Sequence, residues 1–325
     1  MTRIAVDAMG GDFAPAEIVK GAVLASREFQ AEIVLVGDPA KINAALKKHK
    51  AKLPVVAACE VIGMNEHPVQ AVKSKKDASI NVAISLVKEG KADAAVSAGN
   101  TGALMASALF KLGRIPGIER PAIAAEWPLI TGGKVLLLDV GANADCKPKH
   151  LQQFALMGSL YARHIMHIEN PRVALLNIGE EKEKGNDLTR EAWPALKDLP
   201  VNFIGNVESK EILQGKADVI VSDGFVGNMI LKFGETLASY VYKMFKSELS
   251  KGILSKIGLL FLLPALLRLS KKITYDEVGG APLLGIAGIV FKAHGRAKAA
   301  AVKSAIRESL EAAQANLADK LKENI

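Results

Sequence analysis

The stretch ADAAVSAGNTG, residues 92–102, contains the pattern that decides the fold of this chain. An apolar run ends at Val96, a turn of small and polar residues follows, and a helical pattern begins at Gly102. Glycine lets the backbone turn tightly and approach a ligand closely, and the N-terminus of a helix presents free N–H groups to an anion. The stretch therefore predicts a β-strand, a polar glycine turn and an α-helix in succession.

Six other stretches repeat this pattern in whole or in part, with turns at residues 7–12, 37–38, 139–143, 177–179, 205–206 and 222–228. The strands that we expect are residues 3–6, 32–36, 53–57, 92–97, 122–126, 134–139, 172–177, 201–204 and 218–222. Helical patterns cover residues 15–28, 39–48, 79–89, 102–112, 150–165 and 188–197. Such alternation is typical of parallel βαβ units, whose ligands bind at the carboxyl edge of the sheet. We therefore expect the turns to gather on one edge, around a phosphate-bearing substrate.

The chain reads as one compact α/β unit, residues 1–325, that can divide into two lobes. Half of its 325 residues are hydrophobic and only 5% are aromatic, so aliphatic side chains dominate a large core. We find no Gly/Ser linker and no low-complexity tract. After Phe225 the pattern is largely helical, and residues 292–324 are expected to form one long C-terminal helix.

The net charge of +8 favours acidic partners. Nucleic acid is not expected, because the sequence has no nucleic-acid-binding motif and no basic stretch interleaved with aromatic residues. The two cysteines, Cys59 and Cys146, suit a reduced cytoplasmic protein better than a disulfide scaffold, and no signal-peptide pattern is found. We therefore expect a cytoplasmic protein.

The segment IGLLFLLPALL, residues 257–267, is apolar almost all round and is flanked by lysines and an arginine. As a helix it would reach roughly 17 Å, against about 30 Å for the hydrocarbon of a bilayer, so it cannot span a membrane. Its composition suits either an anionic membrane interface or a contact with a second subunit, and one hairpin can serve both. We expect a protruding helical hairpin over residues 241–272, with these residues in its apolar part: Leu259, Leu260, Phe261 and Leu263.

Polar side chains in the glycine turns are the candidates for binding and catalysis. Lys184 and Asn186, separated by a glycine, resemble a hook for phosphate. Asp223 and Asn228 flank the glycine-rich turn at residues 222–228. The other candidates for substrate or phosphate binding are Asp7, Gly10, Gly11, Asp12, Asn100, Thr101, Asp139, Asn143 and His294. No spacing of His, Cys and Asp predicts a metal site, and no GxSxG, Walker A or GxGxxG motif is present, so we expect neither metal nor cofactor.

Taken together, these motifs resemble the bacterial family of acyl-ACP:phosphate acyltransferases of phospholipid synthesis, where ACP is acyl carrier protein. The matching blocks are VDAMGGD (6–12), SAGNTGA (97–103), LDVGAN (138–143), NIG (177–179) with KGN (184–186), SDGFVGN (222–228), GGAPLLG (279–285) and HG (294–295). The blocks follow in order over nearly the whole chain, which makes the resemblance specific.

The resemblance implies a three-layer α/β/α fold with a mostly parallel sheet, similar to isopropylmalate dehydrogenase and phosphotransacetylase, usually as a homodimer. It also implies that inorganic phosphate attacks the thioester of acyl-ACP, which gives acyl phosphate and free ACP without a cofactor. The family associates peripherally with the membrane and passes its product to a membrane glycerol-3-phosphate acyltransferase.

A phosphate anion needs no strong general base, so the protein must bind it, aim it and stabilise the oxyanion at the thioester carbon. Orientation can lower the barrier by ~7–11 kcal/mol, and one oxyanion donor by roughly 2.7–4 kcal/mol. We assign phosphate or oxyanion contact to Lys184 and Asn186, and a second anion site to Asn100 and Thr101. Asp223 and Asn228 would position the reacting groups, and these residues would shape the cleft: Asp7, Asp12, Asp139 and Asn143.

Two alternatives stay open at this point. An NAD-dependent dehydrogenase of similar fold would need a carboxylate cluster for a metal and an arginine cluster for its substrate, and neither is clear in the sequence. A non-catalytic scaffold at the membrane surface would suit the hairpin but would leave the polar turns without a purpose.

Overall fold

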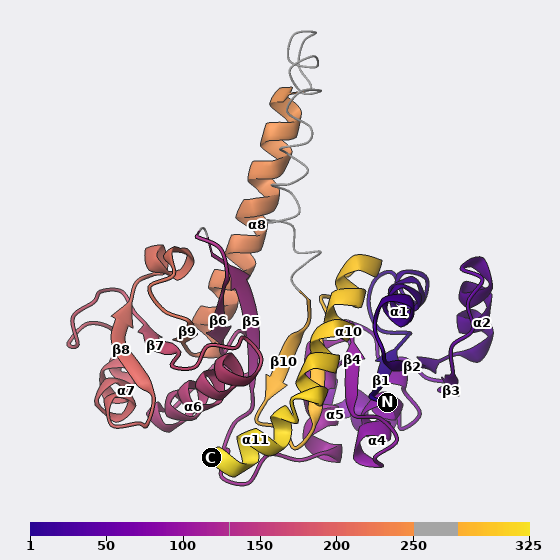
Figure 1. The fold of residues 1–325 in the computed structure, drawn as a ribbon, viewed down its shortest axis with the longest axis horizontal. Helices are drawn as coiled ribbons and strands as arrows, with labels where there is room; N and C mark the ends of the chain where they lie inside the picture. The colour runs from indigo at the N-terminus through magenta and orange to yellow at the C-terminus, as the bar shows by residue number, and fades with distance from the viewer. Residues whose placement is uncertain (130, 250–278) are drawn as a thin grey trace.

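The computed structural model describes residues 1–129, 131–249 and 279–325. The described strands form one sheet of eleven strands, in the order β3-β2-β1-β4-β11-β10-β5-β6-β9-β7-β8. Helices cover both faces of this sheet, and the long helix α8 projects away from it (Figure 1). The predicted class, a three-layer α/β/α fold with a mostly parallel sheet, is confirmed.

The first lobe contains five parallel strands at one end of the sheet. They are β1 (Arg3–Asp7), β2 (Glu32–Gly37), β3 (Val55–Ala57), β4 (Ala94–Ser97) and β11 (Ile289–Lys292). The helices of this lobe are α1 (Ala16–Glu28), α2 (Pro39–Lys48), α3 (Pro68–Ser74), α4 (Ser79–Lys88), α5 (Thr101–Lys111) and α10 (Ala299–Gln314). Asp38 and Asn100 cap α2 and α5 by accepting backbone N–H bonds, so turn residues fix where these helices begin.

The second lobe contains four further strands that are parallel to one another. They are β6 (Lys134–Leu138), β9 (Val219–Val221), β7 (Arg172–Leu176) and β8 (Asn202–Val207). The helical elements here are α6 (Pro148–His164), α7 (Asp187–Lys197), the 3₁₀ helix η1 (Ser209–Gln214) and α8 (Gly224–Leu249), while α11 (Leu317–Asn324) packs against α6.

Two antiparallel strands join the lobes and reverse the direction of the sheet. β10 (Ala281–Leu284) lies antiparallel to β11 and to β5 (Ala122–Pro128), and β5 lies antiparallel to β6. The parallel strands of the second lobe therefore run opposite to those of the first. Our expectation of one common edge is wrong, because the polar turns of the two lobes follow strands that end at opposite edges of the sheet.

The last third of the chain differs most from the sequence-based expectation. It contains β10 and β11, which we did not predict, and the residues between Lys292 and Lys298 form a turn rather than the start of a helix. The expected single helix is two helices, α10 and α11, separated at Asn316, whose φ of 52° lies in the left-handed region. Short apolar runs beside glycine, such as those of β10 and β11, are difficult to distinguish from helix by periodicity.

The expected hairpin is only partly within the described residues. Helix α8 begins at Gly224, inside the turn motif itself, and extends to Leu249. It forms the described part of the protrusion (Figure 1). Residues 250–278 lie outside the described part of the chain, and so do the four apolar hairpin residues Leu259, Leu260, Phe261 and Leu263.

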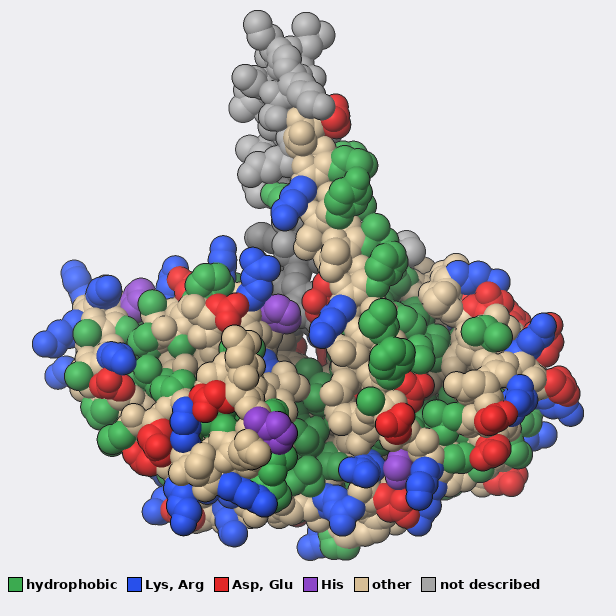
Figure 2. All heavy atoms as spheres, turned by 180° about the vertical axis from the view of Figure 1, so that it is seen from behind, with side chains coloured by type: hydrophobic (Ala, Val, Ile, Leu, Met, Phe, Trp, Pro, Cys, Tyr) green, Lys and Arg blue, Asp and Glu red, His purple; other side chains and the backbone are tan. Residues whose placement is uncertain are grey.

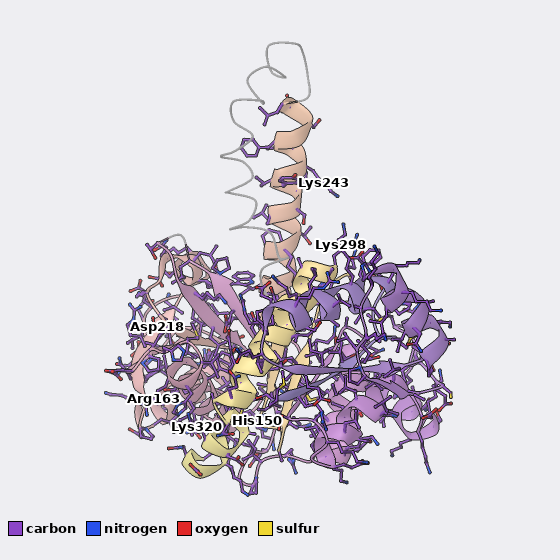
Figure 3. All side chains as sticks on the ribbon, turned by 45° about the vertical axis from the view of Figure 1, so that its right-hand side comes forward. His150, Arg163, Asp218, Lys243, Lys298 and Lys320 are labelled. Carbon is purple, nitrogen blue, oxygen red and sulfur yellow. The ribbon has the colours of Figure 1, made fainter. Side chains whose placement is uncertain are left out.

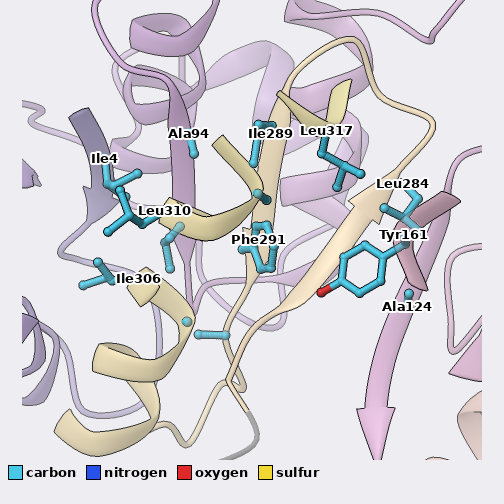
Figure 4. Close-up of a cluster of buried hydrophobic side chains, with 14 of the residues drawn as sticks. Ile4, Ala94, Ala124, Tyr161, Leu284, Ile289, Phe291, Ile306, Leu310 and Leu317 are labelled. Carbon is cyan, nitrogen blue, oxygen red and sulfur yellow. The ribbon is translucent and has the colours of Figure 1, made fainter. Parts of the chain in front are cut away.

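One buried apolar cluster extends through both lobes. It includes Ile4 of β1 and Val219 of β9, both 0% exposed, from opposite halves of the sheet. Tyr161 of α6 and Phe291 of β11 are its largest fully buried members together with Phe154 (Figure 4). The lobes therefore share a core, which fixes the position of the turns of one lobe relative to those of the other.

Gly158 of α6 tests how tightly this core is packed. A Cβ at this position would lie 2.6 Å from Cγ1 of Val219 and 3.0 Å from Cδ2 of Leu138. Overpacking of this kind costs about 1–3 kcal/mol, so Gly158→Ala should lower the free energy of unfolding by that amount in urea denaturation. Arg163→Ala, at an exposed position of the same helix, is the control and should change it little. Equal stabilities of the two variants would contradict the close packing of α6 on the sheet.

Candidate active site

Asp7, at the end of β1, organises the first polar turn of the first lobe. Its side chain is 1% exposed, and its Oδ1 accepts hydrogen bonds from the backbone N–H of Met9 and of Gly10, both at 3.1 Å. Burial raises the pKa of Asp7, and hydrogen bonds that include those from Ser79 and Ser97 act against this shift. The carboxyl group is therefore used to fold the turn, and Gly10 is needed there because a Cβ would lie 2.5 Å from Asp7 Oδ2.

The second turn of this lobe follows β4 and contacts the first. Ser97 donates a hydrogen bond to Asp7 Oδ2 at 2.6 Å, and the N–H of Gly99 donates to Ser97 Oγ. Asn100 is 8% exposed, and its Oδ1 accepts from the N–H of Ala103 while its Nδ2 donates to backbone carbonyls that include that of Met64. Asn100 is thus a helix cap with a satisfied amide group, whereas Thr101, at the first position of α5, is exposed.

The third turn follows β11 and lies against the first. The N–H of Asp12 donates to the carbonyl of Gly295 at 2.8 Å, and a Cβ at Gly11, where φ is +101°, would approach that carbonyl and Ala98. His294 and Asp12 are both exposed. His294 Nε2 lies 3.8 Å from Glu235 Oε2 of α8, so the first-lobe turns meet the helix that begins in the second lobe.

Asp139, directly after β6, has the same function in the second lobe that Asp7 has in the first. It is 0% exposed and accepts from the N–H groups of Ile123, Gly141, Ala142 and Asn143. The amide of Asn143 adds a further bond and also donates to the carbonyl of Pro121. Burial raises the pKa of Asp139, and these hydrogen bonds oppose the increase. Asp139 and Asn143 therefore build the turn.

The turn after β9 packs directly on the Asp139 turn. Asp223 caps α8, because its Oδ1 accepts from the N–H groups of Phe225 and Val226, each at 2.9 Å. A Cβ at Gly224 would lie 2.6 Å from Asp139 Oδ2, and one at Gly227 would overlap the Asp139 carbonyl oxygen. The two glycines thus let α8 begin in contact with the Asp139 turn.

Asn228 differs from the other polar residues of these turns. Its side chain lies beside Gly141, whose Cβ would be 3.5 Å from the Asn228 Cγ. Among the described residues we find no hydrogen-bond partner for its amide group, although the side chain is half-buried. An oriented amide without a protein partner is available to a ligand.

The loop after β7 carries Lys184 and Asn186. Asn177 Nδ2 donates to the carbonyl of Lys184 at 3.0 Å, which folds the loop back onto the end of β7. Asn186 caps α7 by accepting from the N–H of Thr189, so its side chain has a structural role. Lys184 is exposed, and its ammonium group has no ion-pair or hydrogen-bond partner among the residues that the structure describes.

The structure therefore divides the predicted site residues into two groups. Asp139, Asn143, Asp223, Asn228 and the Lys184 loop follow adjacent strands of the second lobe. Asp7, Gly10, Gly11, Asp12, Asn100, Thr101 and His294 gather in the first lobe. Helix α8 connects the groups. Glu235 lies eleven residues after Gly224, which is about 16 Å along the axis at the normal rise of a helix.

Two residues that we did not choose as site candidates also belong to these groups, and one of them, Asn206, lies within β8 rather than in the turn that we expected at residues 205–206. Lys292 is 8% exposed at the end of β11, and Asn206 is 4% exposed in β8, where its amide donates to the carbonyl of Glu181 in the Lys184 loop. Its position just before the His294-Gly295 pair could have indicated Lys292 as a site residue. We did not predict β11, the strand whose end Lys292 occupies. Among the described residues, no group of three or more His, Cys, Asp or Glu side chains is placed to hold a metal ion.

Comparison with known proteins identifies the family. Residues 2–320 match the family model described as "Fatty acid synthesis protein". The chain belongs to this family. A phosphate acyltransferase of Heliobacterium modesticaldum is 54% identical, and the match covers 99% of this chain and 97% of the relative. A phosphate acyltransferase of Moorella thermoacetica is also 54% identical, over 94% of this chain and 90% of the relative.

Solved structures with low sequence identity share the fold. A phosphotransacetylase from Streptococcus pyogenes has a TM-score of 0.65 at 19% identity, and the match covers 97% of this chain and 94% of that one. The EutD phosphotransacetylase from Staphylococcus aureus has a TM-score of 0.61 at 17% identity, with the same coverage. The full-length relatives identify this protein as an enzyme, an acyltransferase that uses phosphate as the acceptor.

Asp139→Asn tests the role of the buried carboxylate in the second lobe. In the wild-type protein the backbone N–H groups donate to both carboxylate oxygens. The substitution replaces one of these oxygens with an NH₂ group that cannot accept, and the lost hydrogen bond should lower the free energy of unfolding by about 1.5–3 kcal/mol. We expect a lower free energy of unfolding in urea and a loss of acyl transfer, because α8 starts on this turn. Asp145→Asn, at an exposed position in the same segment, is the control. An Asp139→Asn variant as stable as this control would show that the turn does not depend on the carboxylate.

Proposed function

We propose that this enzyme transfers a fatty acyl group from the thioester of acyl-ACP to inorganic phosphate, and so supplies acyl phosphate for phospholipid synthesis. One observation carries the assignment of the site: the Lys184 ammonium and the Asn228 amide have no protein partner among the described residues, whereas the neighbouring polar side chains are used to fold the turns. A cation and an amide that are both available suit a phosphate anion and a developing oxyanion.

The reaction balances without a cofactor. An oxygen of hydrogen phosphate forms a bond to the thioester carbon while the carbonyl electrons move to oxygen. When the carbonyl reforms, the carbon–sulfur bond breaks and the sulfur leaves with its electron pair. The proton that hydrogen phosphate carried ends on the ACP thiol, so the products are acyl phosphate and free ACP.

In this proposal the residues have distinct roles. Lys184 holds the phosphate, and Asn228 donates to the oxyanion or orients the carbonyl. Asn186 and Asp223 act by placing the Lys184 loop and the start of α8, since their oxygens accept backbone N–H bonds. The first-lobe turns, with Thr101 and His294 at their surface, supply the second anion-binding region.

The described part of α8 supports the proposal of a homodimer and a membrane-associated protrusion. Many of its exposed large apolar side chains are spaced three or four residues apart, and the series contains Val226, Met229, Phe233, Leu237, Tyr240, Val241, Met244 and Phe245. Phe225 and Tyr242 of this helix are exposed as well. Figure 2 shows hydrophobic side chains along this projecting helix. A stripe of this kind on a solvent-facing helix indicates a partner surface. No helix among the described residues is long and apolar enough to cross a membrane. We propose that the protein works at the membrane surface, where a glycerol-3-phosphate acyltransferase takes its product.

Lys184→Ala tests the proposed phosphate contact. If Lys184 holds phosphate in the transition state, turnover of acyl-ACP should fall by about tenfold or more, which corresponds to about 1.4 kcal/mol. The assay measures acyl phosphate and free ACP thiol after incubation with acyl-ACP and phosphate. Lys182→Ala, an exposed lysine of the same loop, is the matched control and should keep normal turnover. Normal turnover in folded Lys184→Ala would remove this residue from the site.

A second substitution tests membrane association through residues 257–267. Leu260→Glu with Leu263→Glu should release the protein from anionic vesicles in a sedimentation assay, because each leucine loses ~1.5–3 kcal/mol of apolar burial and each glutamate is repelled. Leu24→Glu with Leu213→Glu, at exposed positions of the α/β body, should leave vesicle binding unchanged. If the first pair still sediments with vesicles but no longer forms a dimer, the segment is a subunit interface.

A further inference from the structure

Lys292 is a buried lysine for which the proposed reaction gives no role. It occupies the last position of β11, in register with Ser97 of β4, and Ser97 is in register with Asp7 of β1. All three side chains are nearly inaccessible, with exposures of 8%, 2% and 1%. An ammonium, a hydroxyl and a carboxyl group therefore form one buried row at the ends of three adjacent strands.

The ammonium group of Lys292 connects two of the first-lobe turns. Its Nζ donates to the carbonyl of Ala98, at 3.5 Å, and to the carbonyl of Ala293. Ala98 belongs to the turn after β4, and Ala293 to the turn after β11. The third turn joins through the hydrogen bond from Asp12 N–H to the Gly295 carbonyl. Lys292 thus lies where all three turns meet.

Burying an ammonium group is expensive unless hydrogen bonds and an opposite charge compensate for its lost hydration. A methionine would fill the same space without that penalty. The charge, however, strengthens the bond to the Ala293 carbonyl, attracts the more distant Ala98 carbonyl at 3.5 Å, and offsets the buried carboxyl of Asp7. The ammonium group therefore has a physical effect that an apolar side chain cannot supply.

One of the turns that Lys292 joins contacts helix α8, which begins at the second-lobe turns. His294, two residues after Lys292, lies against Glu235 of α8, and Thr101 begins α5 four residues after Ser97. A change in the relative position of these turns would move the first-lobe side of the site against α8. Misplacement by about 1 Å can reduce a catalysed rate by about a hundredfold.

We propose that Lys292 is a positioning residue for acyl transfer, whose ammonium group holds the turns after β4 and β11 in one fixed arrangement against α8. The inference rests on the proposed function, because it concerns the shape of that same site. It does not require that Lys292 contact the substrate.

The role of Lys292 gives activity a specific pH dependence. Asp7 of β1 and Asp12 of the following turn act electrostatically on Lys292, and His294, two residues further along the chain, lies 3.8 Å from Glu235 of α8. Burial lowers the pKa of Lys292 to about 8, and the two aspartates act in the opposite direction. The ammonium is therefore present below this pH and is lost as the pH rises through it. Inorganic phosphate is already a dianion there, so its own charge changes little, and kcat should decline above pH 8.

The experiment compares Lys292→Met with wild type and with Lys298→Met, an exposed lysine at the start of α10 (Figure 3). We expect Lys292→Met to lower kcat by about tenfold or more at pH 7 and to abolish the decline above pH 8. Hydrogen exchange should become faster in peptides that cover residues 97–102 and 293–296, with little change elsewhere. Lys298→Met should behave as wild type in all three measurements.

The outcomes separate this inference from the proposed function. Failure of the wild-type enzyme to form acyl phosphate would reject the proposed function, while the exchange measurement would still test whether Lys292 holds the turns. Normal kcat and unchanged exchange in Lys292→Met would overturn the inference. If Lys292→Met does not fold, Lys292→Arg replaces it: its guanidinium stays charged throughout, so a decline above pH 8 that persists in this variant would also overturn the inference.

Discussion

A buried carboxyl group that accepts several backbone N–H bonds determines the architecture of each half of this enzyme. Asp7 and Asp139 stand at the ends of β1 and β6, and each is almost completely inaccessible. Burial raises the pKa of each carboxyl group, and the N–H groups that donate to it act in the opposite direction by stabilising the carboxylate. Because the acceptors lie inside the turn, the chain must curl tightly around them. This requirement explains why glycines, rather than larger residues, occupy the positions next to both carboxyl groups.

The directions of the strands then determine where the two turns lie relative to each other. Since β5 and β10 are antiparallel to their neighbours, the two sets of parallel strands end at opposite edges. A ligand that contacts the polar turns of both lobes therefore needs a helix or strand that extends from one set of turns to the other. Helix α8 has this position, because it begins on the Asp139 turn and contacts His294 with Glu235. The tight packing at Gly224 and Gly227 therefore affects the geometry of both lobes.

The sequence was informative where local chemistry decides the structure. Aliphatic runs and polar glycine turns predicted most strands and helices of the first 220 residues, and the order of the motifs indicated the family. The sequence was uninformative where the structure depends on pairing between strands that are distant along the chain. β10 and β11 are four residues each. They pair with each other, but their other neighbours, β5 and β4, lie more than 150 residues earlier, so their place in the middle of the sheet depends on distant partners. Lys292 was overlooked for the same reason, because its burial follows from that pairing.

The same distinction applies to the candidate residues. A polar side chain in a glycine turn can serve the fold or a ligand, and the residue type is the same in both cases. The side chains of Asn100, Asn186 and Asp223 accept backbone N–H bonds within their own turns, and the amide of Asn143 donates to the Asp139 carboxylate and to the Pro121 carbonyl. In the proposed reaction these residues therefore act only through the positions they enforce. Lys184 and Asn228 lack such partners among the described residues, which makes them the groups that a ligand can use directly. A site for phosphate chemistry thus needs both kinds of residue: many polar groups that hold the turns, and a few that the turns leave available.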